Sequence, residues 1–293
     1  MVTNLVVYTA LFGDTETLVE QDVARASSVR FICFTDNPAL TSSTWEIVRV
    51  PPRFPADPRR SQRDIKIRGH HILDEFDVWL YIDNTVKLSV TPEALVDEWL
   101  AEADWAAIQH DSNTTLWEEF EANLQLKKDT PERINEQLQD YSAFYREVLD
   151  QRPLWNGMFV RRNTPAVKSF GELWFEHVLR YSGRDQLSML VALHQAPLTI
   201  NAVEANVRRS PWHSWPHRDG ETKKSKATRH AKTSGLKDLA DELKDAREQI
   251  QALEAENQGL RDRRWFGFGG VIRRVSDERR RRRRAKKQAQ KRA

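Results

Sequence analysis

Short apolar runs alternate with longer amphipathic segments along the first 215 residues of the chain. The apolar runs are rich in β-branched and aromatic residues, which is typical of strands buried on both faces of a sheet. Strands are predicted at residues 5–9, 30–35, 45–50, 78–82, 105–109 and 158–161, and helices at 62–73, 92–102, 116–127, 131–149, 166–181 and 186–193. Strands separated by helices predict an α/β fold with a largely parallel, helix-covered sheet.

Three further segments are predicted after this body domain, residues 1–215. Residues 216–234 are polar and lysine-rich, as in a flexible linker. Residues 235–262 carry a heptad repeat, which predicts a coiled coil and a homodimer formed through residues 236–260. Its a and d positions are Leu236, Leu239, Leu243, Ala246, Ile250, Leu253, Asn257 and Leu260. A single amphipathic helix folded back on the body domain is the alternative.

Charge is distributed unevenly along the chain. Residues 1–215 hold 22 Lys and Arg against 31 Asp and Glu, whereas residues 261–293 hold 15 against 3. The tail, residues 263–293, also places Trp265 and Phe266 beside its arginines. Aromatic side chains next to a polybasic stretch are typical of binding to an anionic membrane surface. Nucleic acid would suit the charge but not the aromatic and glycine residues, and a solvated tail is the third alternative.

The cysteine content and the apolar runs indicate the cellular compartment. The single cysteine, Cys33, excludes an internal disulfide framework and a zinc site built on several thiolates. It lies in an apolar run, so we expect a buried, inert thiol. The N-terminus lacks the basic and apolar regions of a signal peptide, and no apolar run is long enough to span a bilayer. We therefore expect a cytoplasmic protein that can lie peripherally at the inner membrane face.

Asp83 is the first candidate for a functional residue. It follows the apolar run at residues 78–82, and Asn84 and Thr85 come next. Open α/β sheets bind ligands beyond the carboxyl ends of their strands, where a carboxylate can hold a divalent cation against a diphosphate. The alternative is a carboxylate that merely caps the turn after the strand.

Two cations in the next predicted helix form a second candidate site. Arg63 and Lys66 are spaced i,i+3 and share a helix face. We expect them near the N-terminal end of that helix, where two positive charges would suit a diphosphate. The alternative is a solvated helix face.

Asp185 and Gln186 form the third candidate site, at the start of an apolar helix. The residues could face a sugar and its leaving diphosphate, where a carboxylate or an amide can stabilise an oxocarbenium-like transition state or accept the proton of an acceptor hydroxyl. The alternative is an N-cap formed by Asp185.

Weaker candidates follow other strands. Thr9 lies at the end of the first predicted strand, and Asp36 follows the second, where it could bind the edge of a base or a ribose. An Asx turn is the alternative for Asp36. His110, with Glu118 and Glu119 after it, is a candidate for the acceptor side.

The order of these motifs resembles one family. They are Tyr8-Thr9-Ala10 with Phe12-Gly13, Phe34-Thr35-Asp36-Asn37, Arg63-x-x-Lys66 followed by a histidine pair, Trp79-x-x-Ile82-Asp83, His110 with Glu118-Glu119, and Arg184-Asp185-Gln186-Leu187-Ser188. The set is similar to a glycosyltransferase-like family that was first described as a domain of unknown function and then tied to plant mucilage polysaccharide synthesis. The family also has bacterial and phage-borne members, and the resemblance covers about the first 200 residues.

The resemblance implies a GT-A-like, Rossmann-like nucleotide-binding domain that moves a sugar from a nucleotide-sugar donor to a polysaccharide, glycolipid or glycoprotein acceptor. It places Thr9 and Asp36 near the nucleoside, and Arg63 and Lys66 on the diphosphate. The pair Asp185 and Gln186 resembles the loop of retaining galactosyltransferases, which implies retention of configuration.

By the same resemblance, Asp83 would bind a divalent metal, Mn²⁺ or Mg²⁺. GT-A enzymes usually carry Asp-x-Asp here, but the third position is Thr85, so a further ligand such as His213 or His217 would be needed. The alternative to an enzyme is a catalytically degenerate scaffold, dimerised by the heptads and recruited to a membrane or to nucleic acid by the tail.

Overall fold

The computed structural model describes residues 4–13, 16–216, 249–253 and 281. The chain divides into two units, residues 1–224 and 225–293, and each is described by itself. The first unit contains the body domain and all the named strands and helices.

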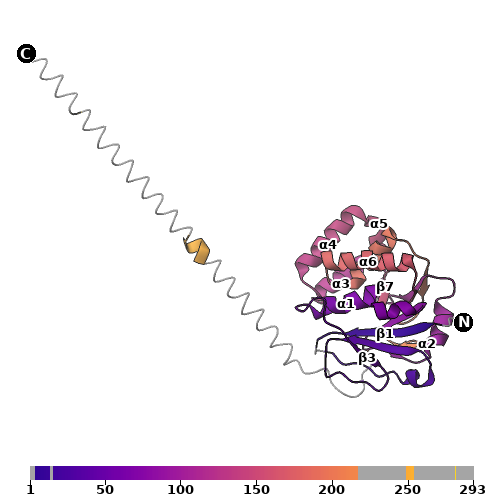
Figure 1. Cartoon of the computed structure of the whole chain (residues 1–293). Coiled ribbons are helices and arrows are strands. Elements are labelled where there is room, and N and C mark those ends of the chain that lie inside the picture. The colour runs from indigo at the N-terminus through magenta and orange to yellow at the C-terminus, as the bar shows by residue number, and fades with distance from the viewer. Residues whose placement is uncertain (1–3, 14–15, 217–248, 254–280, 282–293) are drawn as a thin grey trace, which may run out of the picture. The chain divides into compact units, whose positions relative to one another are not determined.

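A mixed sheet of seven strands forms the centre of the body domain (Figure 1). Its order is β3 (Glu46–Arg49), β2 (Arg30–Thr35), β1 (Leu5–Leu11), β4 (Val78–Ile82), β7 (Leu154–Arg162), β6 (Trp105–Gln109) and β8 (Ile200–Val203). The pairs β3–β2, β2–β1, β1–β4 and β6–β8 are parallel, whereas β7 is antiparallel to both of its neighbours. The predicted α/β fold with a mostly parallel sheet is therefore confirmed.

Two details of the sheet differ from the prediction. β7 begins at Leu154, four residues before the predicted strand, and β8 was not predicted. β8 lies at the sheet edge and has no fully buried residue, so it lacks the apolar run that marks the central strands. A second, two-stranded sheet pairs β5 (Lys87–Leu88) with β9 (His213–Ser214) and was also missed, because strands this short carry no period.

Helices cover both faces of the sheet, as Figure 1 shows for α1 and α6 on one side and α2 on the other. The α-helices are α1 (Pro58–Arg68), α2 (Pro92–Trp99), α3 (Leu116–Gln125), α4 (Pro131–Phe144), α5 (Arg146–Leu149), α6 (Pro165–Arg180) and α7 (Met189–Gln195). Three 3₁₀ helices are η1 (Asp22–Ala26), η2 (His71–Glu75) and η3 (Asp185–Leu187).

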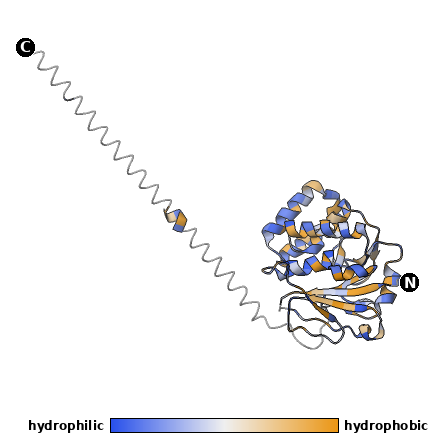
Figure 2. Cartoon of the chain, in the orientation of Figure 1, coloured by the Kyte–Doolittle hydropathy of each residue, from blue (hydrophilic) through white to orange (hydrophobic). Residues whose placement is uncertain are grey.

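Alternating residues of the strands fill two cores, one on each face of the sheet. On the α1 and α6 side, Tyr81 and Phe159 pack with Trp174, and on the α2 side Ile82 and Met158 pack with Trp99. Figure 2 shows the hydrophobic strands between helices whose outer faces are hydrophilic. Burial of both faces explains why the central strands read as continuous apolar runs.

Helix α1 begins earlier and ends earlier than predicted. Asp57 caps its N-terminus by accepting the N–H of Arg60 at 3.0 Å, and Pro58 is the first helical residue. Gly69 ends the helix with a φ of 81°, a left-handed conformation that glycine adopts without strain. The helix therefore starts before Arg63 and ends just beyond Lys66, and the expected position of these two cations near its N-terminus is wrong.

Most of the linker, coiled-coil and tail predictions lie outside the described residues. Within the predicted coiled coil, residues 249–253 are helical, and Ile250 and Leu253 are exposed. None of the helices that the structure describes is both long and apolar enough to cross a membrane.

Candidate functional site

The carboxyl ends of parallel strands β1, β2 and β4 meet at one edge of the sheet and bring predicted site residues there. Asp83 directly follows β4, and its peptide N–H donates to the carbonyl of Gly157 at 2.8 Å. Asp36 follows β2, and its carboxylate accepts the N–H of Gly13 at 2.9 Å, so it fixes the loop after β1. Thr9 is buried within β1 rather than at its end, and its hydroxyl has no partner among the described residues.

A cluster of four charged side chains joins the three candidate sites of the sequence. The two carboxylate oxygens of Asp185 pair with Nε of Arg63 at 2.9 Å and with Nζ of Lys66 at 2.7 Å. Nζ of Lys66 also lies 3.5 Å from Oδ1 of Asp83. The side chains of Asp185 and Lys66 are 4% and 2% exposed, whereas that of Asp83 is 26% exposed. Asp83 therefore faces the solvent side of a cluster that is otherwise buried.

Electrostatic interactions keep Asp185 and Arg63 charged. Burial alone would raise the pKa of Asp185, but the charges of Arg63, Lys66 and Arg184 hold that pKa below its usual range. Burial alone would lower the pKa of Arg63, but Asp185 and Asp83 raise it. Asp185 is thus a carboxylate at neutral pH that can face a cation, but it cannot donate a proton as a general acid, and its low pKa makes it a weak base.

Tyr81 is a member of the site that the sequence did not reveal. Its hydroxyl donates to Oδ1 of Asp83 at 2.7 Å and accepts from Gln62 at 2.6 Å. Nζ of Lys66 lies 5.0 Å from the centre of its ring. Burial and the nearby carboxylate of Asp83 raise the pKa of Tyr81 well above its ordinary value, so the phenol keeps its proton and orients Asp83. The feature that could have identified Tyr81 as a site residue is its position on the face of β4 that turns towards α1.

Two buried side chains, Arg161 and Tyr8, fix the C-terminal half of α1 by hydrogen bonds. Arg161 on β7 donates to the carbonyl of Ile67 and, at 2.8 Å, to the hydroxyl of Tyr8. That hydroxyl in turn donates to the carbonyl of Lys66 at 2.7 Å. These bonds satisfy carbonyls at the end of the helix and fix the position of Lys66.

Asp185 does not cap a helix, contrary to the simpler interpretation. Asp185 is the first residue of η3, and no side chain caps this helix. The carboxylate oxygens of Asp185 form ion pairs with Arg63 and Lys66 instead. Gln186 is buried next to it on the same turn. The loop before η3 is held by Asp129, which accepts the hydroxyl of Ser182 at 2.8 Å.

The His110 group contributes mainly support. Nδ1 of His110 accepts the N–H of Asn113 at 2.9 Å, and its Nε2 lies 3.8 Å from buried Glu119. Glu119 accepts from Asn123, which itself accepts from Nε of Arg184 at 3.1 Å, so this chain of contacts ends beside Asp185. Glu118 forms the capping box of α3 and has a structural role.

The described residues offer a divalent cation only part of a site. Oδ1 of Asp83 is already bonded, the amide of Asn84 donates to Thr17, and the hydroxyl of Thr85 accepts from Nε1 of Trp215 at 3.2 Å. Both ring nitrogens of His213 are engaged by Ser210 and Val207. His217 lies outside the described residues, within which no cluster of three His, Cys, Asp or Glu suits a metal. A cation here would need oxygens of the substrate besides Asp83.

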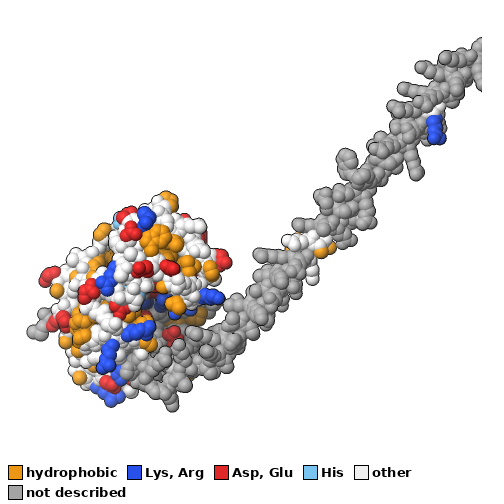
Figure 3. All heavy atoms as spheres, turned by 180° about the vertical axis from the view of Figure 1, so that it is seen from behind, with side chains coloured by type: hydrophobic (Ala, Val, Ile, Leu, Met, Phe, Trp, Pro, Cys, Tyr) orange, Lys and Arg blue, Asp and Glu red, His pale blue; other side chains and the backbone are white. Residues whose placement is uncertain are grey.

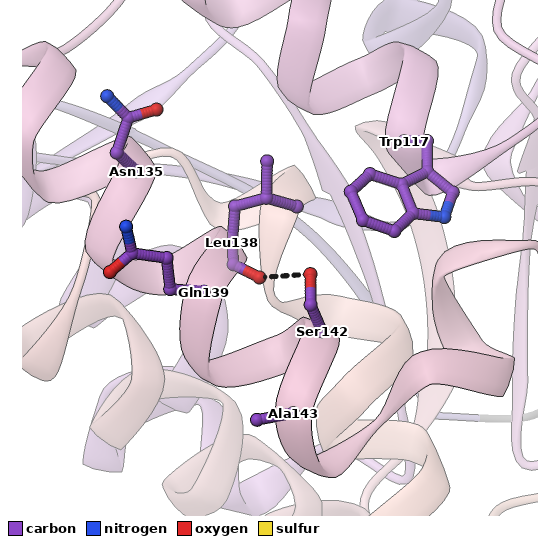
Figure 4. A pocket seen from close by; sticks show the side chains of 6 residues that line it. All are labelled: Trp117, Asn135, Leu138, Gln139, Ser142 and Ala143. Atoms are coloured by element: carbon purple, nitrogen blue, oxygen red, sulfur yellow. Dashed lines mark hydrogen bonds between the residues drawn. The ribbon is translucent and has the colours of Figure 1, made fainter.

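An open groove of about 620 Å³ lies elsewhere, between α3 and α4 (Figure 4). Its lining residues are Trp117, Asn135, Leu138, Gln139, Ser142 and Ala143, and none of them belongs to the charged cluster. On the face shown in Figure 3, acidic and basic side chains are interspersed rather than gathered by sign.

A family model describes the same part of the chain. The model of the TOD1/MUCI70, glycosyltransferase-like domain matches residues 2–210. The chain belongs to this family. The resemblance expected from the sequence is thereby confirmed, and the glycosyltransferase-like domain coincides with the α/β body.

Two individual proteins show the range of similarity. The TOD1/MUCI70 domain here is similar to MUCI70 of Arabidopsis thaliana, a probable hexosyltransferase, with 27% identity over 154 residues. The match covers 49% of this chain and 26% of that protein, so the chain spans about a quarter of its relative. A crystal structure of core-mannan synthase A from Aspergillus fumigatus, in an Mn/GDP form, matches with a TM-score of 0.40 and 11% identity, over 65% of this chain and 69% of that one.

Proposed function

We propose that the body domain is a glycosyltransferase that takes a sugar from a nucleotide-sugar donor and passes it to a polysaccharide, glycolipid or glycoprotein acceptor. The observation that carries the proposal is the buried pairing of Asp185 with Arg63 and Lys66, beside Asp83 at the end of β4. Burying charged groups is costly, and strongly coupled buried charges are typical of functional sites. Membership of a glycosyltransferase-like family supports the same assignment.

Arg63 and Lys66 are the groups proposed to bind the diphosphate of the donor. Without a ligand they are neutralised by Asp185, and a bound diphosphate would offer them a second anion. As the bond between the sugar and the diphosphate breaks, negative charge grows on the leaving phosphate oxygen. Two fixed cations stabilise that charge more than they stabilise the intact donor, which accelerates the reaction.

Asp185 is proposed to act on the sugar side of the breaking bond. Its low pKa keeps it ionised, so it can stabilise positive charge that develops on the sugar ring. The acceptor oxygen forms the new bond to the sugar as the bond to the diphosphate breaks, and its proton passes to the departing phosphate oxygen, which becomes a base as negative charge grows on it. Gln186, next to Asp185, completes the pair from which retention of configuration is proposed.

A divalent metal, Mn²⁺ or Mg²⁺, would neutralise the diphosphate further if Asp83 bound it together with phosphate oxygens. The described donor set is incomplete without the substrate, so the roles of Arg63, Lys66 and Asp185 are proposed independently of a metal. Dimerisation through residues 236–260 and attachment of the tail to an anionic membrane at the cytoplasmic side remain proposals from the sequence.

The test is a thermal-shift panel on the full chain with UDP, GDP, ADP and CMP, each with and without manganese. A ligand that binds only the folded state raises the midpoint by mass action. We expect a selective shift with one nucleotide, reduced in Arg63→Met and Lys66→Met. If no nucleotide shifts a folded sample under any condition, the proposal fails.

A further inference from the structure

The side-chain amide of Asn156 has no role in the contacts described above. Asn156 lies on β7, is 2% exposed, and neither its amide nitrogen nor its amide oxygen has a partner among the described residues. Buried amides nearly always have partners, because an unpaired one costs the free energy of its desolvation. A polar group kept buried and unpaired is therefore a sign of a ligand that completes it.

The position of Asn156 associates it with the charged cluster. The neighbouring residue, Gly157, accepts the peptide N–H of Asp83 at 2.8 Å. The turn η3, which carries Asp185, also packs against β7. β7 thus bonds the residue at the end of β4 and packs against the turn that carries Asp185.

The residue before Asn156 in the chain is aromatic, and its ring packs against a second indole. The indole of Trp155 folds over Gly157, where a Cβ would meet it at 2.2 Å. The ring centroids of Trp155 and half-buried Trp215 lie 5.2 Å apart, and Trp215 donates to Thr85, two residues after Asp83. Aromatic walls with a few fixed polar groups are typical of small-ligand sites.

We propose that Asn156 binds two neighbouring hydroxyls of a sugar ring beside Asp83. An amide presents a donor and an acceptor side by side, and a pair of hydroxyls can satisfy both. The inference rests on the proposed function, because the sugar is either the one transferred from the donor or the first ring of the acceptor. Asn156 would then select among sugars by the placement of their hydroxyls, since an analogue without them leaves the amide unpaired.

The first arm of the test is the thermal stability of the full chain without ligands. Asn156→Leu replaces an unpaired amide with an apolar side chain of similar size, so we expect a higher Tm. Asn123→Leu is the matched control, because that buried amide bonds Glu119 and Arg184, and its loss should lower Tm. A lower Tm for Asn156→Leu would show that the amide has a structural partner, such as a buried water, and would overturn the inference.

The second arm compares the Kd of UDP and GDP with those of UDP-glucose, UDP-galactose and GDP-mannose. If Asn156 binds the transferred sugar, Asn156→Leu keeps the affinity for the free nucleotide and loses about tenfold of the affinity for the nucleotide sugar. If Asn156 binds the acceptor, the variant keeps its affinity for the free nucleotide and for the nucleotide sugar. The wild type saturated with nucleotide then binds methyl glycosides, and the variant does not.

The outcomes separate this inference from the proposed function. A wild type that binds nucleotide sugars, with a variant that retains every affinity, overturns the role of Asn156 and leaves the transferase proposal standing. A wild type that binds none of the nucleotides or nucleotide sugars contradicts both.

Discussion

Removing the carboxylate of Asp185 is the perturbation whose effect on stability follows most directly from the geometry. The substitution Asp185→Ala leaves Lys66, with a 2% exposed side chain, and Arg63, with a 12% exposed side chain, without their closest anion. Asp83 lies farther from Lys66, at 3.5 Å, and Tyr81 already bonds the same oxygen. In the variant, the positive charges of Arg63 and Lys66 therefore stay buried with little to neutralise them.

Breaking a buried ion pair by removing one partner costs about 3–5 kcal/mol. For a domain of this size each kcal/mol lowers Tm by about 2–4 °C, so we expect a fall of about 6–20 °C. A matched control concerns Arg68 at the end of α1, the helix that also carries Arg63 and Lys66. Glu172→Ala removes the partner of Arg68 at 2.8 Å, but that carboxylate is 57% exposed, and the expected cost is below about 1 kcal/mol.

Chemical denaturation of both variants measures the difference. Pyrophosphate provides a further check, because an anion bound by the released cations should raise the Tm of Asp185→Ala more than that of the wild type. Equal stabilities of Asp185→Ala and Glu172→Ala would refute the reasoning, since the cluster would then behave as a surface network.

Other parts of the structure give further expectations. Because the folded pKa of Asp185 is depressed, its contribution to stability is present above the unfolded pKa of about 3.9 and is lost as pH falls through the folded value, so the wild type should lose stability more steeply than Asp185→Ala below about pH 4. Denaturant titrations between pH 2 and 6 measure this, and parallel curves would contradict it. Gly157→Ala should destabilise the fold by about 1–3 kcal/mol, because its Cβ would meet an indole at 2.2 Å, whereas Gly183→Ala, with the nearest atom at 3.7 Å, should be milder. The same denaturation assay compares them, and equal costs would show that the indole moves freely. Replacing Ile250 and Leu253 with Glu should convert a dimer into a monomer in sedimentation, and a monomeric wild type would contradict the heptad prediction.

The sequence singled out residues that the structure brings together, but it did not predict their arrangement. Asp83 could be placed because it ends a run buried on both faces, and Asp185 because a polar cluster opens an apolar segment. Their meeting with Lys66 depends on α1 and η3 crossing the same end of the sheet, which is a tertiary fact that no local pattern contains. The start of α1 at Pro58 differs from the predicted start at residue 62 although Asp57 and Pro58 form a regular capping signal, because several prolines lie close together there and proline is typical of loops.

Other errors have physical causes of the same kind. β7 pairs antiparallel with two neighbours, and strand direction is not encoded in a short apolar run. Tyr81 and Asn156 lie inside buried strands, where an aromatic or a single amide looks like ordinary packing until its partners are known. Arg161 is similar, since its importance comes from the carbonyl of Ile67, which is distant in the sequence.

The release of free nucleoside diphosphate from a nucleotide sugar by the full-length protein tests the central claim most directly. Without a glycan acceptor, water can take the sugar slowly, so the assay needs no knowledge of the natural acceptor. We expect the wild type to release the nucleotide from one donor class, and folded Lys66→Met and Asp83→Asn variants to release it at least about tenfold more slowly. No release by the wild type from any donor, with or without added glycans, or equal release by the variants, would contradict the assignment of this cluster as a glycosyltransferase site.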